Sequence, residues 1–493
     1  MTPAPGPSGD GLLVYGLGRS GLAVVERARA LDLPVAFYEA RPGGADVERA
    51  QALGCHRVTD LATWLELGRA SGTVPAQAVA APGVRIDHPD LELLRRAGVE
   101  VIGEVEWVWR LVPGRYVGVT GTAGKGSVTR WCGDTLAAAG VEVEVGGNIV
   151  PALAAVARPG ALHMVEMSSF QLERCPTFAP DVAVILNLGE DHIDRHGSVA
   201  AYHRAKKNLL ANLGEGHTLV INADDVVLRD WAEEAEARGV RVLRFSLERQ
   251  ADAHLAEDGQ IHLAGRALLP RGELQVRGDH QVANALATAL VAWACGLEQR
   301  QIREGLRAFQ GVPGRYSPAG AVGNVRFIED SIATRPLAVA AALRASERPL
   351  VWLAGGQAKG ADLAGLSELV ANRVDLLLTF GESADVFARA YEGLTEIERV
   401  KEGSGEATMR SLVDRALRYL AEHHGGAGTV LLSPLATSFD QFSDYKARGA
   451  AFRRAVEAAA GPGDADPSPA QQAGASGQTT EAHRPQRPTP EHA

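Results

Sequence analysis

The sequence has little of what marks several common classes of protein. Only four cysteines occur in 493 residues, and none forms a CxxC pair. We therefore expect buried or free thiols in a reducing cytosol. Residues 1–10 lack a basic start followed by an apolar core, so no signal peptide is expected. Because no apolar run is long enough to span a bilayer, we expect a cytoplasmic chain without stable membrane insertion.

An excess of positive charge is also missing. Lys and Arg number 50 against 60 Asp and Glu, which gives a formal net charge of -10, and no basic stripe stands out. Binding of nucleic acid by phosphate neutralisation is therefore not expected. An anionic substrate would have to be held by local features, such as helix N-termini, a few Arg and Lys side chains, or metal ions.

The remaining pattern is one of short apolar strands that alternate with Ala- and Leu-rich helical stretches. It predicts an α/β protein with mostly parallel sheets and crossover helices. The length allows about three domains of ordinary size. Pro/Gly breaks and a polar, Pro-rich C-terminal composition predict domains over 1–112, 113–312 and 313–460, and a disordered tail over 461–493.

Most of the unusual residues follow a predicted strand. In open α/β sheets, ligands lie beyond the carboxyl ends of the strands, so these positions are candidate binding sites. The strands are predicted at residues 11–15, 34–38, 115–120, 163–167, 181–188, 325–328, 350–353, 375–380 and 429–432.

A glycine-rich turn follows the strand predicted at 115–120 and precedes a helix predicted at 128–139, which Gly140 should end. Glycines in such a turn let backbone N–H groups surround phosphate oxygens, and the helix N-terminus adds positive potential. Lys125 would reach the terminal phosphates of ATP, and Ser127 would offer a hydroxyl to Mg²⁺. The turn is shorter than the common GxxxxGKS form, and a plain strand-to-helix turn is the structural alternative. Its sequence is Gly121-Thr122-Ala123-Gly124-Lys125-Gly126-Ser127.

A second glycine pattern, GxGxxG, occupies residues 16–21, and the acidic Glu39 ends the next predicted strand. This arrangement matches the dinucleotide fingerprint and predicts a diphosphate at a helix N-terminus. The motif alone does not choose between NAD and another diphosphate ligand. An ordinary tight turn between strand and helix is the alternative.

Glu166 and His192 follow neighbouring predicted strands. A carboxylate and an imidazole at adjacent strand ends suit a divalent cation, with water and phosphate in the other positions. Alone, each is as readily a solvated or hydrogen-bonded loop residue, but the nearby phosphate-binding turn favours the metal interpretation. Lys206 and Lys207 come later at helical spacing, where a basic, solvated helix face is the default interpretation.

Several motifs, in this order along the chain, resemble those of the Mur ligases, from about Leu12 to Arg453. The SSFQLE and SPxxxSFDxF runs resemble the D-glutamate-adding members of the family more than their sister ligases. The motifs are GxGxSG at 16–21, APGV at 81–84, GTxGKxS at 121–127, GGNI at 146–149, SSFQLE at 168–173, EDHxDRH at 190–196, NALA at 284–287, DSIAT at 330–334, GGQAKG at 355–360 and SPxxxSFDxF at 433–442.

The resemblance implies a Rossmann-like UDP-binding domain, a central P-loop-type ATPase domain and a Rossmann-like amino-acid-binding domain. It implies an ATP- and Mg²⁺-dependent ligase of peptidoglycan synthesis, expected to act as a monomer. ATP would phosphorylate the carboxylate of UDP-N-acetylmuramoyl-L-alanine, and the amine of D-glutamate would then displace phosphate. A carboxylate is a poor acyl donor and an acyl phosphate a better one, so catalysis would be mainly positioning and charge neutralisation.

The resemblance also assigns roles to residues of this chain. Lys125, His192 and Lys206 match catalytic residues, and Lys206 matches a lysine that the family carbamylates into an acidic, metal-associated group. Metal ligands would be Ser127, Glu166, His192 and carbamylated Lys206. The turn at 121–127 would bind ATP with Asn284, Arg315 and Asp330. The UDP-substrate would contact Gly18, Ser20, Glu39, Arg41, Gly83 and Asn148, and D-glutamate would contact Thr334, Lys359, Ser438 and Tyr445.

Some positions depart from the family pattern. Glu39 stands where Asp is commoner, Ala40 where a hydroxyl residue is frequent, Ile332 where Lys is often seen, and Tyr445 where Phe is common. Gly126 gives the GKGS form, which is also found in folylpolyglutamate synthases, cousins in the same ligase group.

These departures define the alternatives. A sister Mur ligase or a folate polyglutamate ligase is the closest one, although the complete N-terminal GxGxSG segment and the C-terminal run oppose the folate ligase. A non-catalytic nucleotide-binding protein or an NAD-dependent sensor is the alternative from another class, and it leaves the phosphate-binding turn and its neighbours unexplained.

Overall fold

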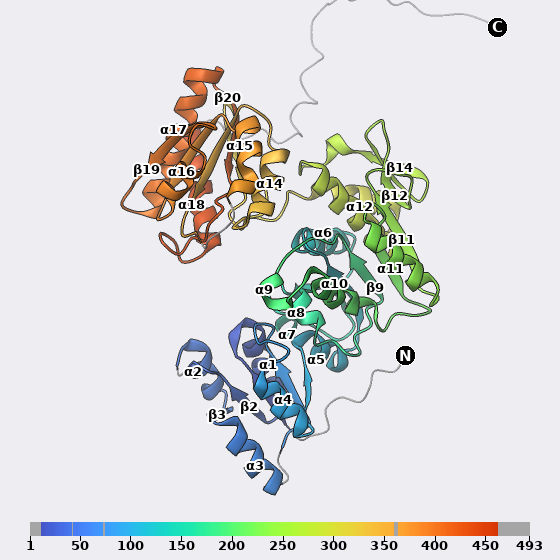
Figure 1. Ribbon diagram of the computed structural model, residues 1–493. Helices are drawn as coiled ribbons and strands as arrows, with labels where there is room; N and C mark the ends of the chain where they lie inside the picture. The colour runs from blue at the N-terminus through green and yellow to red at the C-terminus, as the bar shows by residue number, and fades with distance from the viewer. Residues whose placement is uncertain (1–10, 42, 72–73, 359–362, 462–493) are drawn as a thin grey trace, which may run out of the picture. The chain divides into compact units, whose positions relative to one another are not determined.

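A computed structural model describes residues 11–41, 43–71, 74–358 and 363–461 (Figure 1). The chain divides into two compact units. The first unit contains the residues up to Pro318 together with Arg344–Ser346, and the second contains Ala319–Leu343 and the residues from Glu347 onward. Two sheets belong to the first unit, and a third sheet belongs almost wholly to the second.

The first sheet has five strands in the order β3-β2-β1-β4-β5, and every pairing is parallel. Its central strand β1 has neighbours on both sides that come later in the chain, so the order reverses there, and the GxGxxG turn follows this strand. The strands are β1 (Leu12–Tyr15), β2 (Val35–Tyr38), β3 (His56–Val58), β4 (Gln77–Ala80) and β5 (Glu100–Ile102). The helices are α1 (Gly18–Ala30), α2 (Ala45–Ala52), α3 (Leu61–Ser71), α4 (Pro89–Arg96) and α5 (Glu104–Leu111).

The second sheet has nine strands in the order β14-β13-β12-β11-β10-β9-β6-β8-β7. Its pairings are parallel except for β12–β13 and β13–β14, which are antiparallel. The strands are β6 (Arg115–Thr120), β7 (Val143–Gly147), β8 (Leu162–Glu166), β9 (Val182–Ile185), β10 (Thr218–Asn222), β11 (Arg241–Ser246), β12 (Ala253–Leu255), β13 (Gln260–Leu263) and β14 (Arg266–Pro270).

Helices of this part of the chain carry several of the candidate site residues, among them Lys125, Lys206 and Asn284. The long helix α12 is buried nearly all round, against α6 and the sheet, because its sequence is almost continuously apolar. The helices are α6 (Lys125–Ala138), α7 (Leu153–Val156), α8 (Ser169–Leu172), α9 (Ile193–His196), α10 (Val199–Lys207), α11 (Val226–Glu236), α12 (Asp279–Ala294) and α13 (Gln299–Ala308), with short 3-10 turns at Asn208–Leu210 and Arg271–Glu273.

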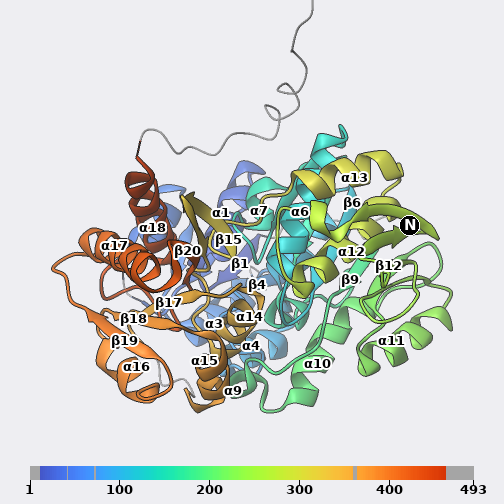
Figure 2. The same ribbon diagram turned by 90° about the horizontal axis from the view of Figure 1, so that it is seen from above.

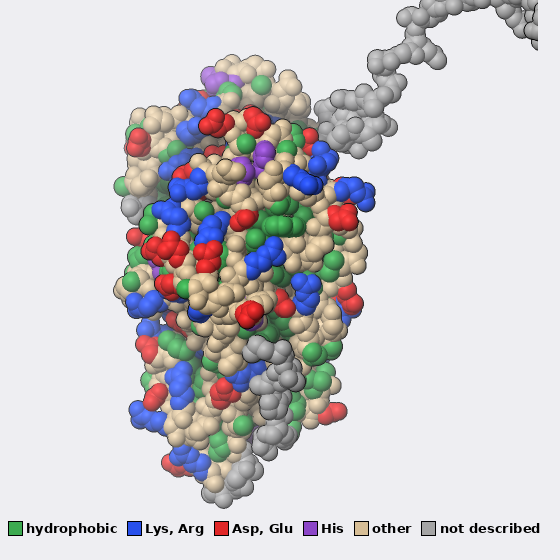
Figure 3. Space-filling model, turned by 90° about the vertical axis from the view of Figure 1, so that its right-hand side faces the viewer, with side chains coloured by type: hydrophobic (Ala, Val, Ile, Leu, Met, Phe, Trp, Pro, Cys, Tyr) green, Lys and Arg blue, Asp and Glu red, His purple; other side chains and the backbone are tan. Residues whose placement is uncertain are grey.

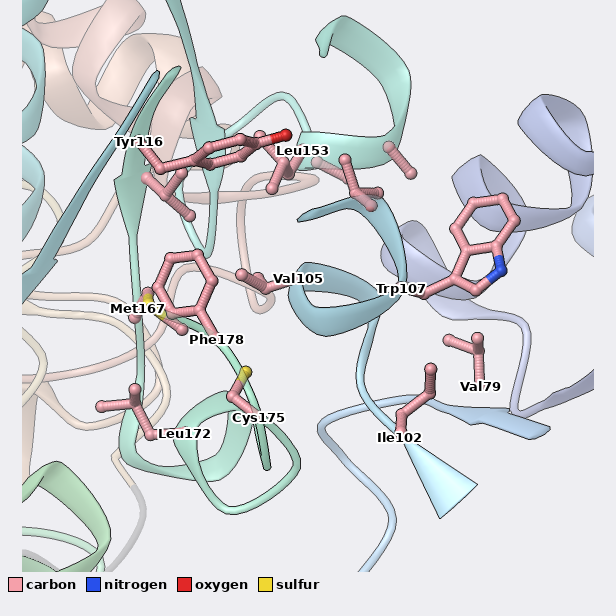
Figure 4. Packing of buried hydrophobic residues seen from close by; sticks show 14 of the residues in the cluster. Val79, Ile102, Val105, Trp107, Tyr116, Leu153, Met167, Leu172, Cys175 and Phe178 are labelled. Atoms are coloured by element: carbon pink, nitrogen blue, oxygen red, sulfur yellow. The ribbon is translucent and has the colours of Figure 1, made fainter. Parts of the chain in front are cut away.

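One hydrophobic cluster joins the two sheets of the first unit. The buried side chains of Val105 and Trp107 on α5 lie in the same cluster as Tyr116 on β6 and Phe178 after α8, as Figure 4 shows. The Tyr116 hydroxyl also donates to Val112 O at 2.7 Å, across the link between the sheets. Truncating a buried aromatic side chain of this kind costs about 3–5 kcal/mol, so this cluster is a major source of stability.

The third sheet has six strands in the order β15-β16-β20-β17-β18-β19. The pairings from β16 to β19 are parallel. Figure 2 shows α17 and α18 along one face of this sheet and α15 and α16 along the other. The strands are β15 (Ser317–Val322), β16 (Asn324–Glu329), β17 (Leu350–Gly355), β18 (Leu376–Phe380), β19 (Glu396–Val400) and β20 (Ala427–Leu432). The helices are α14 (Pro336–Ala345), α15 (Ser367–Arg373), α16 (Ala384–Ala390), α17 (Gly405–His424) and α18 (Tyr445–Ala460), with a 3-10 turn at Ala364–Leu366.

The predicted α/β class with mostly parallel sheets is confirmed. The helix predicted at 128–139 was wrong at its start, because α6 begins at Lys125 and takes the end of the glycine-rich turn into its first helical turn. Gly140 follows this helix with φ +86°, as a helix-ending glycine should. The boundaries at 112 and 312 stay a prediction, since the first two sheets share one compact unit. The predicted tail lies, apart from Gly461, outside the described residues.

The surface carries both signs of charge. On the face shown in Figure 3, Lys and Arg side chains are interspersed with Asp and Glu. Within the described parts of the chain, none of the helices combines the length and the apolar character needed to cross a bilayer.

Candidate active site

The glycine-rich turn leads directly from the buried strand β6 into α6. Gly124 precedes the helix with φ +81°, a backbone conformation that favours glycine. A Cβ on Gly124 would lie 2.5 Å from Oδ1 of Asn284, so a larger residue does not fit there. No side chain caps the start of α6. Its first N–H groups therefore lack helical partners and form an anion site of the kind that binds phosphate.

Asn187, which follows β9, holds the other half of the turn. Its Oδ1 accepts from the N–H groups of Thr122 and Ala123 at 3.1 and 2.9 Å, and its Nδ2 donates to Ala123 O at 3.2 Å. These two amides are therefore already bonded, which leaves the start of α6 as the part of the turn open to an anion.

Lys125 lies at the first position of α6. Its Nζ donates to Gly121 O at 2.9 Å and to Thr122 O at 3.1 Å, so the side chain folds back along the turn. Burial lowers the pKa of Lys125, the Glu166 carboxylate opposes this shift, and Arg315 adds to it. The ammonium group thus lies in a confined site among charges of both signs.

Glu166 ends β8 and is only 2% exposed. Its Oε1 accepts from Nδ2 of Asn148 at 2.9 Å, whereas its Oε2 is buried without a hydrogen-bond partner among the described residues. A Cβ on Gly126 would lie 3.1 Å from Oε2, so this oxygen faces the start of α6. A buried carboxylate oxygen without a partner is costly, and a cation beside the glycine-rich turn would remove that cost.

Lys206 on α10 is 1% exposed, so the interpretation as a solvated helix face is wrong for this residue. Its Nζ donates to Gly121 O at 2.8 Å and lies 4.5 Å from the centre of the Tyr202 ring. Burial, reinforced by the positive charge of Lys125, lowers the pKa of Lys206 to about 6. The neighbouring Lys207 is half-buried and pairs with Glu234 at 2.7 Å.

His192 has a left-handed backbone conformation, with φ +53°, immediately before α9. Its ring lies against Phe170, with centroids 4.7 Å apart, and its Nε2 is 3.4 Å from Oδ2 of Asp191. Burial lowers the pKa of His192, and the charges of Lys125 and Lys206 lower it further against the opposing effect of Asp194. The neutral imidazole that results can offer a lone pair to a metal.

The structure brings the predicted ATP and metal residues of the first unit to this one turn. Asn284 lies beside Gly124, and the Arg315 guanidinium would be 3.3 Å from a Cβ on Gly126. In the described residues, no three His, Cys, Asp or Glu side chains gather into a possible metal site. The predicted metal set contains only two residues of those types, Glu166 and His192, and its other members are Ser127 and Lys206.

A second site, a pocket of about 360 Å³, lies beyond the ends of β1, β2, β4 and β7. It brings together all six residues predicted to contact the UDP-substrate. Arg19 and Gln171 also line it. Neither was predicted as a contact residue, although both lie within motifs of the sequence, GxGxSG and SSFQLE. The lining is Gly16, Gly18, Arg19, Ser20, Glu39, Arg41, Ala81, Pro82, Gly83, Val84, Gly147, Asn148 and Gln171.

Glu39 holds the glycine-rich turn of this pocket. Its Oε2 accepts from Leu17 N at 3.0 Å, and its Oε1 accepts from Arg41 N at 3.1 Å and Arg41 Nε at 3.2 Å. Burial alone would raise the pKa of Glu39, but these hydrogen bonds lower it below its ordinary value. The carboxylate therefore stays charged and orients the turn that precedes α1.

The remaining predicted residues belong to the second unit. Asp330 follows β16, and its Oδ2 accepts from Oγ of Ser433 at 2.9 Å. Ser438 is buried, Thr334 is half-buried, and Tyr445 is half-buried at the start of α18. Lys359 lies outside the described residues.

Two sequence models of known domains match this chain. That of the Mur ligase middle domain matches residues 119–292, and that of the Mur ligase glutamate ligase domain matches residues 314–434. The UDP-N-acetylmuramoylalanine–D-glutamate ligase of Thermus thermophilus is 42% identical over 452 residues, which cover 91% of this chain and 98% of the relative. The chain belongs to the Mur ligase family.

Other relatives of this Mur ligase carry the same name. Those of Deinococcus radiodurans and Myxococcus xanthus are 42% and 37% identical, over 92% of this chain in both cases and over 93% and 99% of the relatives. Solved structures share its fold at lower identity. A MurF structure from Acinetobacter baumannii has a TM-score of 0.58 at 16% identity and covers 86% of this chain and 91% of its own. MurC of Thermotoga maritima has a TM-score of 0.55 at 18% identity, over 91% and 99% of the two chains.

Proposed function

We propose that this Mur ligase uses ATP and Mg²⁺ to join D-glutamate to the carboxylate of UDP-N-acetylmuramoyl-L-alanine during peptidoglycan precursor synthesis. The observation that carries the proposal is the glycine-rich turn at the start of α6, with the buried Glu166 oxygen and Lys206 beside it. The name shared by relatives over nearly their full length supports the choice of substrates.

We assign the ATP phosphates to the residues around the turn. The free N–H groups at the start of α6 would hold phosphate oxygens, and Lys125 would turn from the carbonyls of Gly121 and Thr122 towards them. Asn284 and Arg315 lie against the same turn and would contact the nucleotide. Asp330 of the second unit is proposed as a further nucleotide contact.

The proposed metal ligands are Ser127, Glu166, His192 and Lys206 as its carbamate. Bound Mg²⁺ would neutralise charge on the transferring phosphoryl group. The depressed pKa of Lys206, about 6, supports the carbamate because only a neutral amine can add to CO₂. The carbamate would give this buried position a negative charge and oxygen ligands, which a lysine lacks.

The reaction would run in two steps. A carboxylate oxygen of the UDP-substrate attacks the γ-phosphorus of ATP, the bond to the bridging oxygen breaks, and ADP leaves. The amine of D-glutamate then attacks the acyl carbon, inorganic phosphate leaves, and the nitrogen loses a proton to form the amide. The protein would contribute mainly alignment and charge stabilisation in both steps.

The two organic substrates are assigned to two separate groups of residues. The pocket that includes Gly18, Ser20 and Asn148 would hold the UDP-substrate, with Arg19 as an additional positive group for its diphosphate. Thr334, Lys359, Ser438 and Tyr445 are proposed as the D-glutamate contacts. Hydroxyl donors and one lysine suit a small dianionic amino acid.

Phosphate release tests the proposal directly. The purified protein is given ATP, Mg²⁺, UDP-N-acetylmuramoyl-L-alanine and one amino acid at a time. We expect turnover with D-glutamate and little with other amino acids. Equal or better turnover with folate and L-glutamate would replace the proposal with a folate ligase. Tight NAD binding without UDP-substrate binding would replace it with a nucleotide sensor. We also infer a cytoplasmic monomer, which size-exclusion chromatography and cell fractionation test.

A further inference from the structure

Arg195 connects the two sites of the first unit. It lies in α9, shortly after His192, and its guanidinium donates to three successive carbonyls across the structure. Nη2 donates to Pro82 O at 3.2 Å and to Val84 O at 2.7 Å, and Nη1 donates to Gly83 O at 3.1 Å. All three carbonyls belong to the segment after β4 that lines the UDP pocket.

The guanidinium of Arg195 is held in place by its own neighbours. Its Cζ lies 4.4 Å from the centre of the Phe170 ring, and Nη2 is 3.9 Å from Oε2 of Glu173. The side chain is only 13% exposed. A planar cation stacked on an aromatic ring and beside a carboxylate has little freedom left, so its donors are already aimed at the pocket segment. The same Phe170 ring lies against the ring of His192.

The pocket segment has few other supports at its centre. A Cβ on Gly83 would meet no atom within 4 Å, so side-chain packing does not fix this residue. Arg174 also donates to this segment, from Nη2 to Val84 O at 2.5 Å. Among the described side chains, the hydrogen bonds to the carbonyls of Pro82 and Gly83 come from Arg195.

We propose that Arg195 is a positioning residue for the UDP-linked substrate. It holds residues 82–84 in the shape that the pocket requires, through three bonds that a guanidinium fork can make together. The proposal rests on the proposed function, which places the UDP-substrate in this pocket. Lysine at this position would keep the charge but could not reproduce the planar set of donors.

The test uses the full chain with Arg195→Lys and Arg195→Met. Arg303→Lys is the matched control, because Arg303 is also half-buried and its Nε donates to a backbone carbonyl, that of Leu268 at 2.6 Å, outside the pocket lining. Calorimetry measures the Kd of uridine diphosphate alone, without ATP or Mg²⁺. Steady-state assays measure kcat and the KM of the UDP-substrate and of ATP.

We expect Arg195→Lys to raise the Kd of uridine diphosphate and the KM of the UDP-substrate about tenfold, and Arg195→Met to raise them further. The kcat and the KM of ATP should stay within about twofold of wild type, the pattern of lost ground-state binding. Arg303→Lys should leave all four values unchanged.

Two results would overturn the positioning role. The first is a lower melting temperature in both Arg195 variants with unchanged affinity for uridine diphosphate, which would make Arg195 a structural contact only. The second is a fall in kcat with unchanged KM of the UDP-substrate. If Arg195→Met does not fold, the Kd, KM and kcat values of Arg195→Lys alone decide between the positioning role and a structural role. Failure of the proposed function would show separately, as absence of turnover by the wild type, and the binding measurements would still judge Arg195.

Discussion

Asn148 and Glu166 are joined by a hydrogen bond from Nδ2 of the amide to Oε1 of the carboxylate, at 2.9 Å. Asn148 lines the proposed UDP-substrate pocket, and the other oxygen of Glu166 faces the start of α6. The Asn148 carbonyl also accepts from Nη2 of Arg19 at 2.8 Å. One residue thus contacts the glycine-rich turn of the first sheet and the carboxylate that faces the start of α6.

Asn148→Leu should therefore affect both proposed sites. Losing the amide donor leaves the buried Glu166 carboxylate without its hydrogen bond, so we expect the KM of the UDP-substrate and the Mg²⁺ concentration for half-maximal rate each to rise about fivefold or more. Magnesium titrations at several substrate concentrations measure both. Asn212→Leu is the control, because the Asn212 amide bonds only to the carbonyls of Pro176 and Phe178 in the described structure. A change in only one of the two values would mean that the bond does not couple the sites.

Lys125→Ala should abolish turnover and leave the fold intact. The substitution removes the cation nearest the proposed phosphates, and the loss of one preorganised charge of this kind lowers kcat by about 10²–10³-fold. Because Lys125 is buried and its pKa is lowered by burial, removing it should not reduce the melting temperature. Phosphate-release assays check the loss of turnover, and thermal unfolding checks that the fold is intact. Near-normal activity would show that the turn has only a structural role.

Lys206 should make the stability of the protein depend on pH. Its pKa falls from 10.5 to about 6 on folding, so between these values the unfolded chain binds a proton that the folded chain does not. Stability from this residue therefore rises with pH across that window and is lost as the pH falls towards about 6. Thermal unfolding of wild type and of Lys206→Met in CO₂-free buffer at several pH values measures this pH dependence of stability. The melting temperature of wild type minus that of the variant should grow from about pH 6 to about pH 9. A constant difference would contradict the lowered pKa.

A carbamate on Lys206 predicts chemical rescue. Lys206→Ala should lose most activity, and short carboxylic acids such as acetate or formate should restore part of it by placing a carboxylate where the carbamate stood. The measurement is phosphate release against acid concentration, with chloride at the same ionic strength as the comparison. Equal stimulation by chloride, or none by either anion, would argue against the carbamate.

Gly126→Ala should weaken ATP binding. The added Cβ would lie 3.1 Å from Oε2 of Glu166 and 3.3 Å from Cζ of Arg315, which is tighter than ordinary contact. Both groups would have to move away from the start of α6, so we expect the KM of ATP to rise about three- to tenfold. Gly214→Ala is the control, because the nearest atom to its Cβ would be 4.0 Å away. An unchanged KM of ATP would mean that Glu166 and Arg315 can shift without cost.

The features predictable from sequence are those fixed by neighbouring residues. Gly124 and Lys125 have their roles in the turn because strand, turn and helix follow one another in the chain. The same holds for Gly16 and Gly18, since a glycine-rich turn after a strand is a local pattern. The parallel sheets follow from the same alternation of strands and helices.

The features missed depend on contacts between residues far apart in sequence. Arg195 meets residues 82–84, and Asn187 meets Thr122 and Ala123, only after the sheets have formed. The spacing of Lys206 and Lys207 alone favours a solvated helix face, and only the family resemblance predicted a role for Lys206 at the site. Its burial depends on contact with the turn after β6. Such burial is a property of the packed structure and leaves no local signal.

The hydrophobic cluster that includes Trp107 and Phe178 joins both sheets of the first unit into one core, so neither sheet is stable without the other. Excising the segment up to residue 112 would strip the apolar cover from both remaining surfaces, so neither fragment should persist as a native, stand-alone module. A destabilising substitution on either side of this shared interior should therefore disturb both the turn before α6 and the pocket beyond β1. We therefore expect the two sheets of the first unit to unfold together under heat or denaturant, and to become accessible to protease together.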